Sequence, residues 1–181
     1  WIDVWKKHFR PIHLGKIVVV PEWIAYTPTK DEKVVLLDSN MAFGTGEHET
    51  TSMCVEWLQS FITPDSVCID VGCGSGILSV AGLLLGAESA VGVDIDALAV
   101  KTAVANAEVN GVSEKFTGIC GNLAEKVTGK FDVVVANIVA DIVILLTQDA
   151  PRFMNPDTVY IMSGIIDTRE DDVLACLAEK F

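Results

Sequence analysis

Basic side chains are scarce in this sequence of 181 residues. Lysine and arginine number 13 against 25 aspartates and glutamates, which gives a formal net charge of −12. A protein that grips nucleic acid needs clustered Lys and Arg to displace counterions from the phosphates, so this composition argues against direct nucleic-acid binding. An acidic chain instead favours a basic partner, although its charge can also serve solubility alone.

Paired cysteines and long apolar runs are missing too. The five cysteines form no Cys-x-x-Cys pair and have no matching histidines, so neither a metal site nor a disulfide framework is expected. Such a scattered set predicts a reduced, cytoplasmic protein. No apolar run reaches the roughly 18 residues of a membrane span, and no signal peptide is evident. The chain begins at Trp1 rather than Met, which suggests a fragment of something longer.

A glycine-rich turn is the most informative motif that the sequence does contain. The stretch 67–78 reads as an apolar strand, a turn with Gly72, Gly74 and Gly76, and the start of a helix. Alternating glycines let a ligand lie against bare main chain, with N–H groups of the next helix aimed at it. Asp70 stands just before the turn and suits a ligand ammonium better than a pyrophosphate. The alternative is a tight strand-to-helix connection that binds nothing.

A second acid completes the expected ligand site. Residues 90–94 read as another buried strand that ends in Asp94, close to the roughly 20-residue offset at which a carboxylate takes ribose hydroxyls. A site with one carboxylate for an ammonium group and another for ribose hydroxyls fits a ribonucleoside with an amino-acid tail. This combination points to S-adenosylmethionine as the cofactor.

Three further polar side chains are candidate ligand contacts. Thr51 lies on the inward side of the first turn of a helix that follows a polar, glycine-bearing loop, where it either caps the helix or touches a ligand. Asn122 follows a third strand, where it either reads an adenine or caps a helix. Asn137 closes a strand over 131–137, at the edge where ligands of open α/β sheets collect.

Strand and helix alternate throughout residues 67–181, which predicts an α/β fold with a doubly wound, mostly parallel sheet. Before it, residues 1–33 are expected to form a short helix and a hairpin that covers an edge of the sheet. Beyond the glycine turn we expect strands over 90–94, 115–119, 131–137 and 158–163, and helices over 77–85, 97–109, 140–150 and from about 170 onward.

Two helices are expected to bury aromatic residues. The spacing i, i+3, i+4, i+7 predicts that Cys54, Trp57, Leu58 and Phe61 face the core. In the last helix the inward positions are Val173, Leu177 and Phe181, after a start that resembles a capping box, with Asp167 and Glu170. Asp96 is the expected N-cap of the helix over 97–109.

With these motifs assembled, residues 67–163 resemble a class I S-adenosylmethionine-dependent methyltransferase. Nearly the whole chain is similar to the ribosomal protein L11 methyltransferase family. The block Ala42-Phe43-Gly44-Thr45-Gly46-x-His48 followed by Thr50-Thr51 is more specific than the glycine turn. Other matching stretches are 37–38, 72–78, 94–96, 135–138 and 163–165. The chain departs from the family at Ser39-Asn40, Glu47 and Glu49, which concerns substrate choice more than cofactor binding.

The resemblance implies a Rossmann-like methyltransferase core over 51–181, preceded by an extension and cofactor-covering loop over 1–50. The family also has a substrate-recognising domain before this region and a closing strand pair after it. It implies methyl transfer to lysine and N-terminal amines of a basic ribosomal protein. Thr51, Gly72, Asp94 and Asn137 carry over as cofactor contacts. With the residues inferred above, the expected cofactor set is Thr51, Asp70, Gly72, Gly74, Gly76, Asp94, Asn122 and Asn137.

Two residues are candidates for a catalytic role. Asn137 is expected to position the incoming amine, and His48 either acts in catalysis or fixes the loop over 41–51; no general base is assigned. The alternatives are a class I methyltransferase that acts on another protein, a small molecule or RNA, and a non-catalytic module that binds the cofactor as scaffold or sensor. A nicotinamide dehydrogenase is the least favoured because its glycine spacing is absent.

Overall fold

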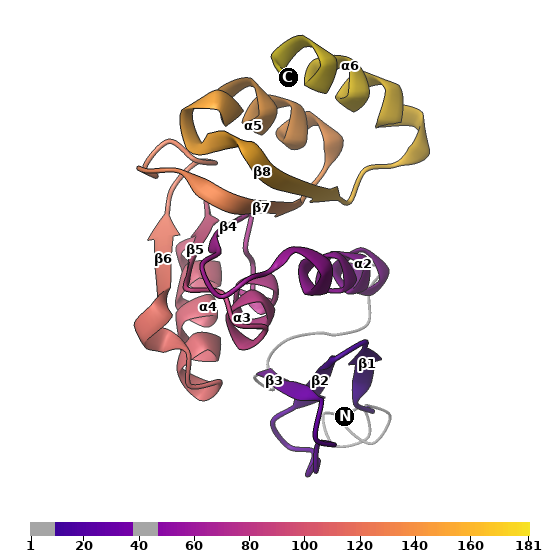
Figure 1. Ribbon diagram of the computed structural model, residues 1–181, viewed down its shortest axis with the longest axis vertical. Coiled ribbons are helices and arrows are strands. Elements are labelled where there is room, and N and C mark those ends of the chain that lie inside the picture. Colours follow the sequence, from indigo (N-terminus) through magenta and orange to yellow (C-terminus); the bar gives the residue numbers. More distant parts are fainter. Residues whose placement is uncertain (1–9, 38–46) are drawn as a thin grey trace.

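A five-stranded parallel sheet forms the centre of the molecule (Figure 1). The computed structural model describes residues 10–37 and 47–181. The strand order is β6-β5-β4-β7-β8, and every neighbouring pair is parallel. The strands are β4 (Val67–Val71), β5 (Ser89–Asp94), β6 (Phe116–Cys120), β7 (Phe131–Asn137) and β8 (Met154–Ser163). This order, which reverses between β4 and β7, confirms the predicted doubly wound sheet.

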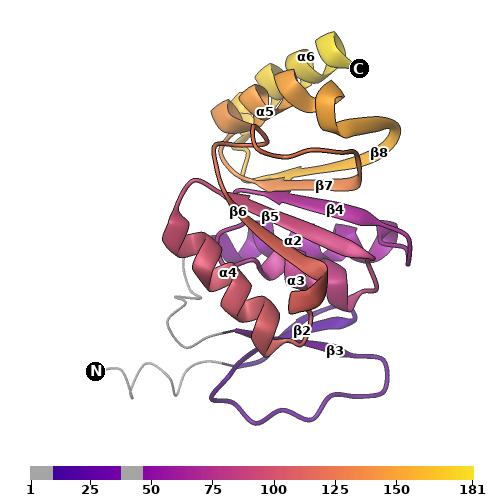
Figure 2. The same ribbon diagram turned by 90° about the vertical axis from the view of Figure 1, so that its left-hand side faces the viewer.

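Helices cover both faces of this sheet, as a parallel sheet requires. They are α2 (Glu47–Phe61), α3 (Ile77–Leu84), α4 (Ala97–Val109), α5 (Ala140–Phe153) and α6 (Glu170–Lys180). Along β7 the buried side chains alternate between two cores: Val133 and Val135 pack with α2 and α3, and Val134 and Ala136 pack with α5. Figure 2 shows α5 and α6 on the side of the sheet away from α2, α3 and α4.

The N-terminal extension forms a small sheet of its own. Strands β1 (Ile12–Leu14) and β2 (Ile17–Pro21) make the predicted hairpin, and β3 (Lys33–Leu37) pairs in parallel with β2. The expectation that it covers an edge of the main sheet was wrong, because it packs on α2, α3 and α4. Gln59 Nε2 donates to the Leu14 carbonyl at 2.8 Å, and its Oε1 accepts from Lys16 N at 2.7 Å. The hairpin therefore rests on the helical layer.

Helix α2 buries a different stripe from the one predicted. Cys54 and Leu58 are buried as expected, but Trp57 is 57% exposed and Phe61 38% exposed. The buried side is made by Cys54, Val55 and Leu58, which are spaced i, i+1, i+4. Two stripes of this helix are apolar enough to face the core. The stripe that is buried in the structure is the one that also turns Thr51 inward.

Helix α6 also departs from the expectation. It is preceded by a 3-10 turn, η2 (Asp167–Arg169), and its N-cap residue Arg169 makes no side-chain cap, so no capping box forms. Val173 is buried, Leu177 is half-buried, and Phe181 is exposed. The side chain of Asp96 does cap α4, accepting from Leu98 N at 2.8 Å as predicted.

Several other strands and helices begin or end a few residues away from their predicted bounds. Strand β6 lies one residue later than predicted, and β8 begins at Met154 rather than at 158. Helix α5 runs through Pro151 to Phe153. Pro151 lies in the last turn, and because it has no N–H it cannot donate to the carbonyl four residues earlier. A short 3-10 helix, η1 (Ser113–Lys115), joins α4 to β6.

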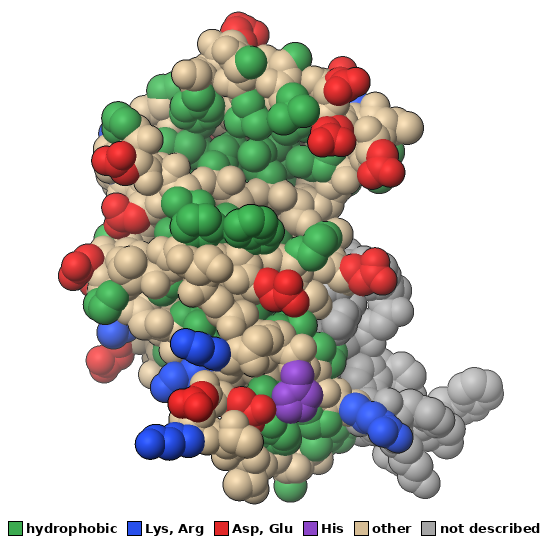
Figure 3. All heavy atoms as spheres, turned by 45° about the vertical axis from the view of Figure 1, so that its right-hand side comes forward, with side chains coloured by type: hydrophobic (Ala, Val, Ile, Leu, Met, Phe, Trp, Pro, Cys, Tyr) green, Lys and Arg blue, Asp and Glu red, His purple; other side chains and the backbone are tan. Residues whose placement is uncertain are grey.

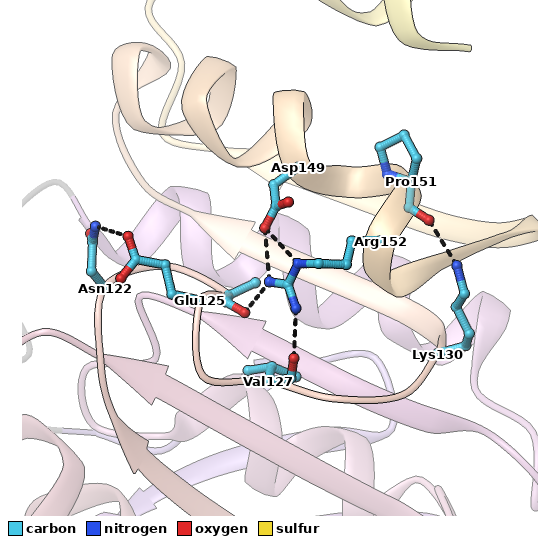
Figure 4. A network of polar contacts seen from close by, with 8 residues as sticks. Asn122, Glu125, Val127, Lys130, Asp149, Pro151 and Arg152 are labelled. Atoms are coloured by element: carbon cyan, nitrogen blue, oxygen red, sulfur yellow. Dashed lines mark hydrogen bonds and ion pairs between the residues drawn. The ribbon is translucent and has the colours of Figure 1, made fainter.

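A polar network ties the loop over 121–130 to the end of α5 (Figure 4). The Arg152 guanidinium donates to the backbone carbonyls of Ala124 and Val127 and to the carboxylate of Asp149. Lys130 Nζ donates to the carbonyl of Pro151 at 2.7 Å. A cationic side chain there satisfies a carbonyl in the last turn of the helix. The loop after β6 is therefore fixed by long-range contacts.

Candidate functional site

A cavity of about 500 Å³ opens where β4 and β7 end. Its walls come from five places: Thr50 and Thr51 of α2, the glycine turn with Asp70, the start of α3, residues 137–139 at the end of β7, and Gly164 after β8. This is the position, at the carboxyl ends of strands where the strand order reverses, at which open α/β sheets bind ligands. Its volume falls in the range of small-molecule sites.

The glycine turn needs residues without a Cβ. Gly72, Gly74 and Gly76 have φ of 75°, 51° and 75°, which L side chains rarely adopt. Gly72 and Gly74 line the cavity, and a Cβ on Gly74 would point into open space. Gly76 was expected to contact the ligand; it is not among the residues that line the cavity, although its neighbours Ser75 and Ile77 are. A Cβ on Gly76 would lie 2.7 Å from Ala103 Cβ of α4, so Gly76 serves helix packing.

Asp70 borders the cavity and is almost fully buried, with 3% of its surface exposed. Its Oδ2 accepts from Ser79 N at 3.2 Å and from Ser79 Oγ at 3.0 Å. The Ser79 N–H belongs to the first turn of α3, so this helix N-terminus already holds a carboxylate. Burial raises the pKa of Asp70 to about 7, despite the Ser79 hydrogen bonds that lower it. A cationic ligand would stabilise its charged form.

The buried carboxyl predicts a pH-dependent stability that an amide would lack. Since folding raises the pKa of Asp70 from 3.8 to about 7, the stability that the neutral form contributes is complete below pH 4 and is lost as pH rises toward 7. In urea unfolding of the ligand-free protein, we expect wild type to lose about 3 kcal/mol relative to Asp70→Asn between pH 5 and pH 8. Parallel pH profiles for the two proteins would contradict this assignment.

Asp94 lies at the end of β5, beside the glycine turn. Its Oδ2 accepts from Gly74 N at 2.9 Å, and its Oδ1 accepts from Asp96 N at 2.9 Å. Asp94 is not among the residues that line the cavity. The carboxylate thus fixes Gly74 in place, and each of its oxygens keeps a lone pair for a ligand hydroxyl.

Asn137 and Thr51 meet across the cavity. Asn137 Nδ2 lies 3.2 Å from Thr51 Oγ1, to which it donates, so the end of β7 is joined to α2. Thr51 lies in the second turn of α2 rather than the first, because the helix begins at Glu47. The carbonyl oxygen and the second N–H of Asn137 are left to meet a ligand. The structure therefore brings two predicted residues together in the cavity wall.

Gly164 also lines the cavity, and it was not predicted as a site residue. Its φ is 83°, and a Cβ there would lie 2.9 Å from the Ile138 carbonyl and 3.2 Å from Asn137 Oδ1. Only glycine leaves room for the Asn137 side chain at this point. The sequence offered one sign, since residues 163–165 carry part of the family resemblance, but no local pattern links them to Asn137.

Asn122 does not line the cavity, and the position of the His48 side chain is not described. Asn122 is exposed, and its Nδ2 donates to Glu125 Oε1 at 2.8 Å, in the loop that Arg152 holds (Figure 4). It lies in a turn rather than capping a helix. His48 lies in the first turn of α2, but its side chain is outside what the structure describes. The remaining predicted loop, with Ser39, Asn40 and residues 41–46, is also outside the described residues.

The described cavity residues favour positioning over covalent chemistry. Burial raises the pKa of the thiol of Cys73, which lines the cavity, and raises that of Cys54, a core residue of α2 outside the cavity, to about 11. Both therefore stay protonated at neutral pH and make poor nucleophiles. Residues 10–37 and 47–181 contain no group of three His, Cys, Asp or Glu that could hold a metal ion. Within the same residues, no helix is long and apolar enough to cross a membrane.

Known proteins resemble this chain along its whole length. The family model described as "Ribosomal protein L11 methyltransferase (PrmA)" matches residues 1–181. A ribosomal protein L11 methyltransferase of Clostridium perfringens (strain SM101 / Type A) is 45% identical over 181 residues, 99% of this chain and 58% of the relative. One of Caldicellulosiruptor saccharolyticus is 44% identical over 180 residues, 99% of this chain and 59% of the relative. The chain thus spans less than two thirds of these relatives.

Solved structures resemble the fold to different degrees. The crystal structure of ribosomal protein L11 methylase from Lactobacillus delbrueckii subsp. bulgaricus has a TM-score of 0.87 and 33% identity. The match covers 96% of this chain and 88% of that chain. A 16S rRNA N2 G1207 methyltransferase of T. thermophilus, solved with AdoMet and guanosine, has a TM-score of 0.64 and 24% identity. That match covers 77% and 40% of the two chains, and it bears on the fold alone.

Proposed function

Since this chain belongs to the ribosomal protein L11 methyltransferase family, we propose that it binds S-adenosylmethionine and transfers methyl groups to lysine and N-terminal amines of ribosomal protein L11. The observation that carries the proposal is the cavity at the switch point of the sheet, with the glycine turn, Asp70 and Asn137 in its walls. A basic acceptor agrees with the net charge of −12. In this proposal residues 51–181 form the cofactor-binding core, residues 1–50 form the extension, and the protein works in the cytoplasm.

The residues present fit the cofactor. Gly74 offers open space where a Cβ would stand, so a ligand can approach the backbone of the turn. The buried Asp70 carboxyl suits an ammonium group, and Asp94 has lone pairs left for sugar hydroxyls. We therefore assign the cofactor contacts to Thr51, Asp70, Gly72, Gly74, Asp94 and Asn137. Gly76 and Asn122 do not line the cavity, so their predicted contacts with the cofactor remain predictions from the sequence.

S-adenosylmethionine supplies a methyl group made electrophilic by a positively charged sulfur. The protein's part is to bring an amine into line in a site that excludes water. A lysine amine has a pKa near 10.4, so it enters mostly protonated and without a free lone pair. The apolar side chains of Ile138 and Val139 line the cavity beside Asn137 and disfavour the charged form. The Asn137 carbonyl oxygen can accept an N–H of the neutral amine and orient it.

Two assays test the proposal in order. Calorimetry of the purified chain with S-adenosylmethionine should show binding at one site. Transfer of a radiolabelled methyl group to purified ribosomal protein L11 should follow, with this chain and with the product of its complete reading frame. Cofactor binding without transfer by either protein would overturn the activity and favour a non-catalytic binding module. Labelling of a small molecule or of RNA in place of L11 would contradict the proposed methyl acceptor.

A further inference from the structure

The outer face of α2 carries a row of apolar side chains that nothing in the described structure covers. Met53, Trp57 and Phe61 follow one another at intervals of four residues, so they lie on one side of the helix. They are 49%, 57% and 38% exposed. The rings of Trp57 and Phe61 are stacked, with centroids 5.9 Å apart and an angle of 12° between their planes. Figure 3 shows a row of hydrophobic side chains across the middle of this face.

Acidic side chains accompany this row. Glu49 and Glu56 are exposed, and their spacing places them on the same side of α2 as Met53 and Trp57. Figure 3 shows acidic side chains beside the apolar row. Helix α2 contains no lysine or arginine, and no described cation is recorded over the Trp57 or Phe61 ring. Exposed aromatic rings flanked by carboxylates attract Lys and Arg side chains, through cation–π contacts and charge pairing.

The same helix leads into the cavity. Thr50 and Thr51 line the cavity, and Trp57 and Phe61 follow Thr51 by six and ten residues. At a rise of 1.5 Å per residue, the two rings lie roughly 9 and 15 Å farther along the helix axis. An extended peptide covers about 3.3 Å per residue. The axial distance alone therefore corresponds to roughly three to five residues of an extended chain, and the path around the helix from the cavity side to the outer side adds to it.

We propose that the outer face of α2, made of Glu49, Met53, Glu56, Trp57 and Phe61, docks the methyl acceptor. The occupant is a segment of ribosomal protein L11 with a Lys or Arg at least about three residues from the methylated amine. This inference rests on the proposed function and adds a contact surface on the catalytic core to the substrate-recognising domain that the family resemblance implies. The cavity walls bind the cofactor and the amine, while the α2 face holds the polypeptide segment next to that amine.

The test compares the double variant Trp57→Ser/Phe61→Ser with Leu145→Ser. Leu145 is a half-exposed apolar residue of α5, on the other side of the sheet, so it controls for the loss of exposed apolar surface. The measurements are KM for ribosomal protein L11 and kcat at saturating S-adenosylmethionine, together with cofactor affinity and the unfolding midpoint. We expect the double variant to raise the acceptor KM about tenfold or more, with cofactor affinity and kcat unchanged. The control should match wild type.

A charge variant adds an independent measurement. Glu56→Lys should raise the acceptor KM several-fold at low salt and less at high salt, because the effect is electrostatic. If wild type methylates L11 and the double variant has the same acceptor KM, the docking proposal fails and the proposed function stands. If wild type neither binds nor methylates L11, both fail. If wild type self-associates in sedimentation and the double variant does not, the face joins two copies of the chain and the docking proposal is overturned.

Discussion

Asp94→Ala is expected to weaken the binding of S-adenosylmethionine by about 100-fold or more. The carboxylate fixes Gly74 of the turn through a 2.9 Å hydrogen bond, and in our proposal its free lone pairs hold the ribose. Hydrogen bonds to a charged group contribute about 1.5–3 kcal/mol each, so the loss of two corresponds to two or more orders of magnitude. Calorimetry with the purified chain measures the change.

Asp96→Ala provides a matched control for this experiment. Asp96 lies two residues later and caps α4 through its side chain, but that side chain makes no recorded contact with the glycine turn. Its loss should cost about 1 kcal/mol of stability and leave cofactor affinity within a few-fold of wild type. Wild-type affinity in Asp94→Ala would show that the ribose is held elsewhere, and the site would have to be reassigned.

Asn137→Ala is expected to lower kcat by about 100-fold at saturating cofactor. In the structure its Nδ2 is engaged with Thr51 Oγ1, which leaves the carbonyl oxygen to orient the amine. A nucleophile that is held in the wrong geometry loses most of the rate gained by binding both reactants in one site. Loss of a single positioning contact commonly lowers kcat by about 100-fold. Steady-state transfer to L11 with the cofactor well above its dissociation constant gives kcat directly.

Thr51 offers the comparison for Asn137. Thr51→Val removes the hydroxyl that accepts from Asn137 but keeps the shape, so it should lower kcat by less than Asn137→Ala. Thr51→Ser keeps the hydroxyl and should stay near wild type. Normal turnover in Asn137→Ala would mean that the amine is aligned without this carboxamide.

Much of the candidate site could be read from local sequence because of where its residues stand. Gly72, Gly74 and Asp70 surround one strand end, and Asn137 closes the neighbouring strand. In a parallel sheet such ends meet at one edge, so knowing each strand was enough to place these side chains together. Thr51 was predicted from its place on the helix after the polar loop, and the family resemblance, which the comparisons confirm, pointed to the same residue.

Several contacts of the predicted residues join distant segments and could not be predicted from local sequence. Gly76 faces Ala103 of α4, and Asn122 turns to Glu125 in a loop that Arg152 fixes from α5. No periodicity within either segment encodes these partners. The predicted burial of Trp57 and Phe61 was wrong for another reason, since α2 has two apolar stripes and only tertiary packing decides which one is buried.

Helix α2 meets the rest of the protein and solvent on different sides, with Thr51 in the cavity wall and the Trp57–Phe61 stack facing outward. A single rigid rod would then act as a molecular ruler, since its pitch fixes how far the gripped residue stands from the reacting one. Choice among several amines of the acceptor would follow from spacing along its chain, with little need to contact the residues in between.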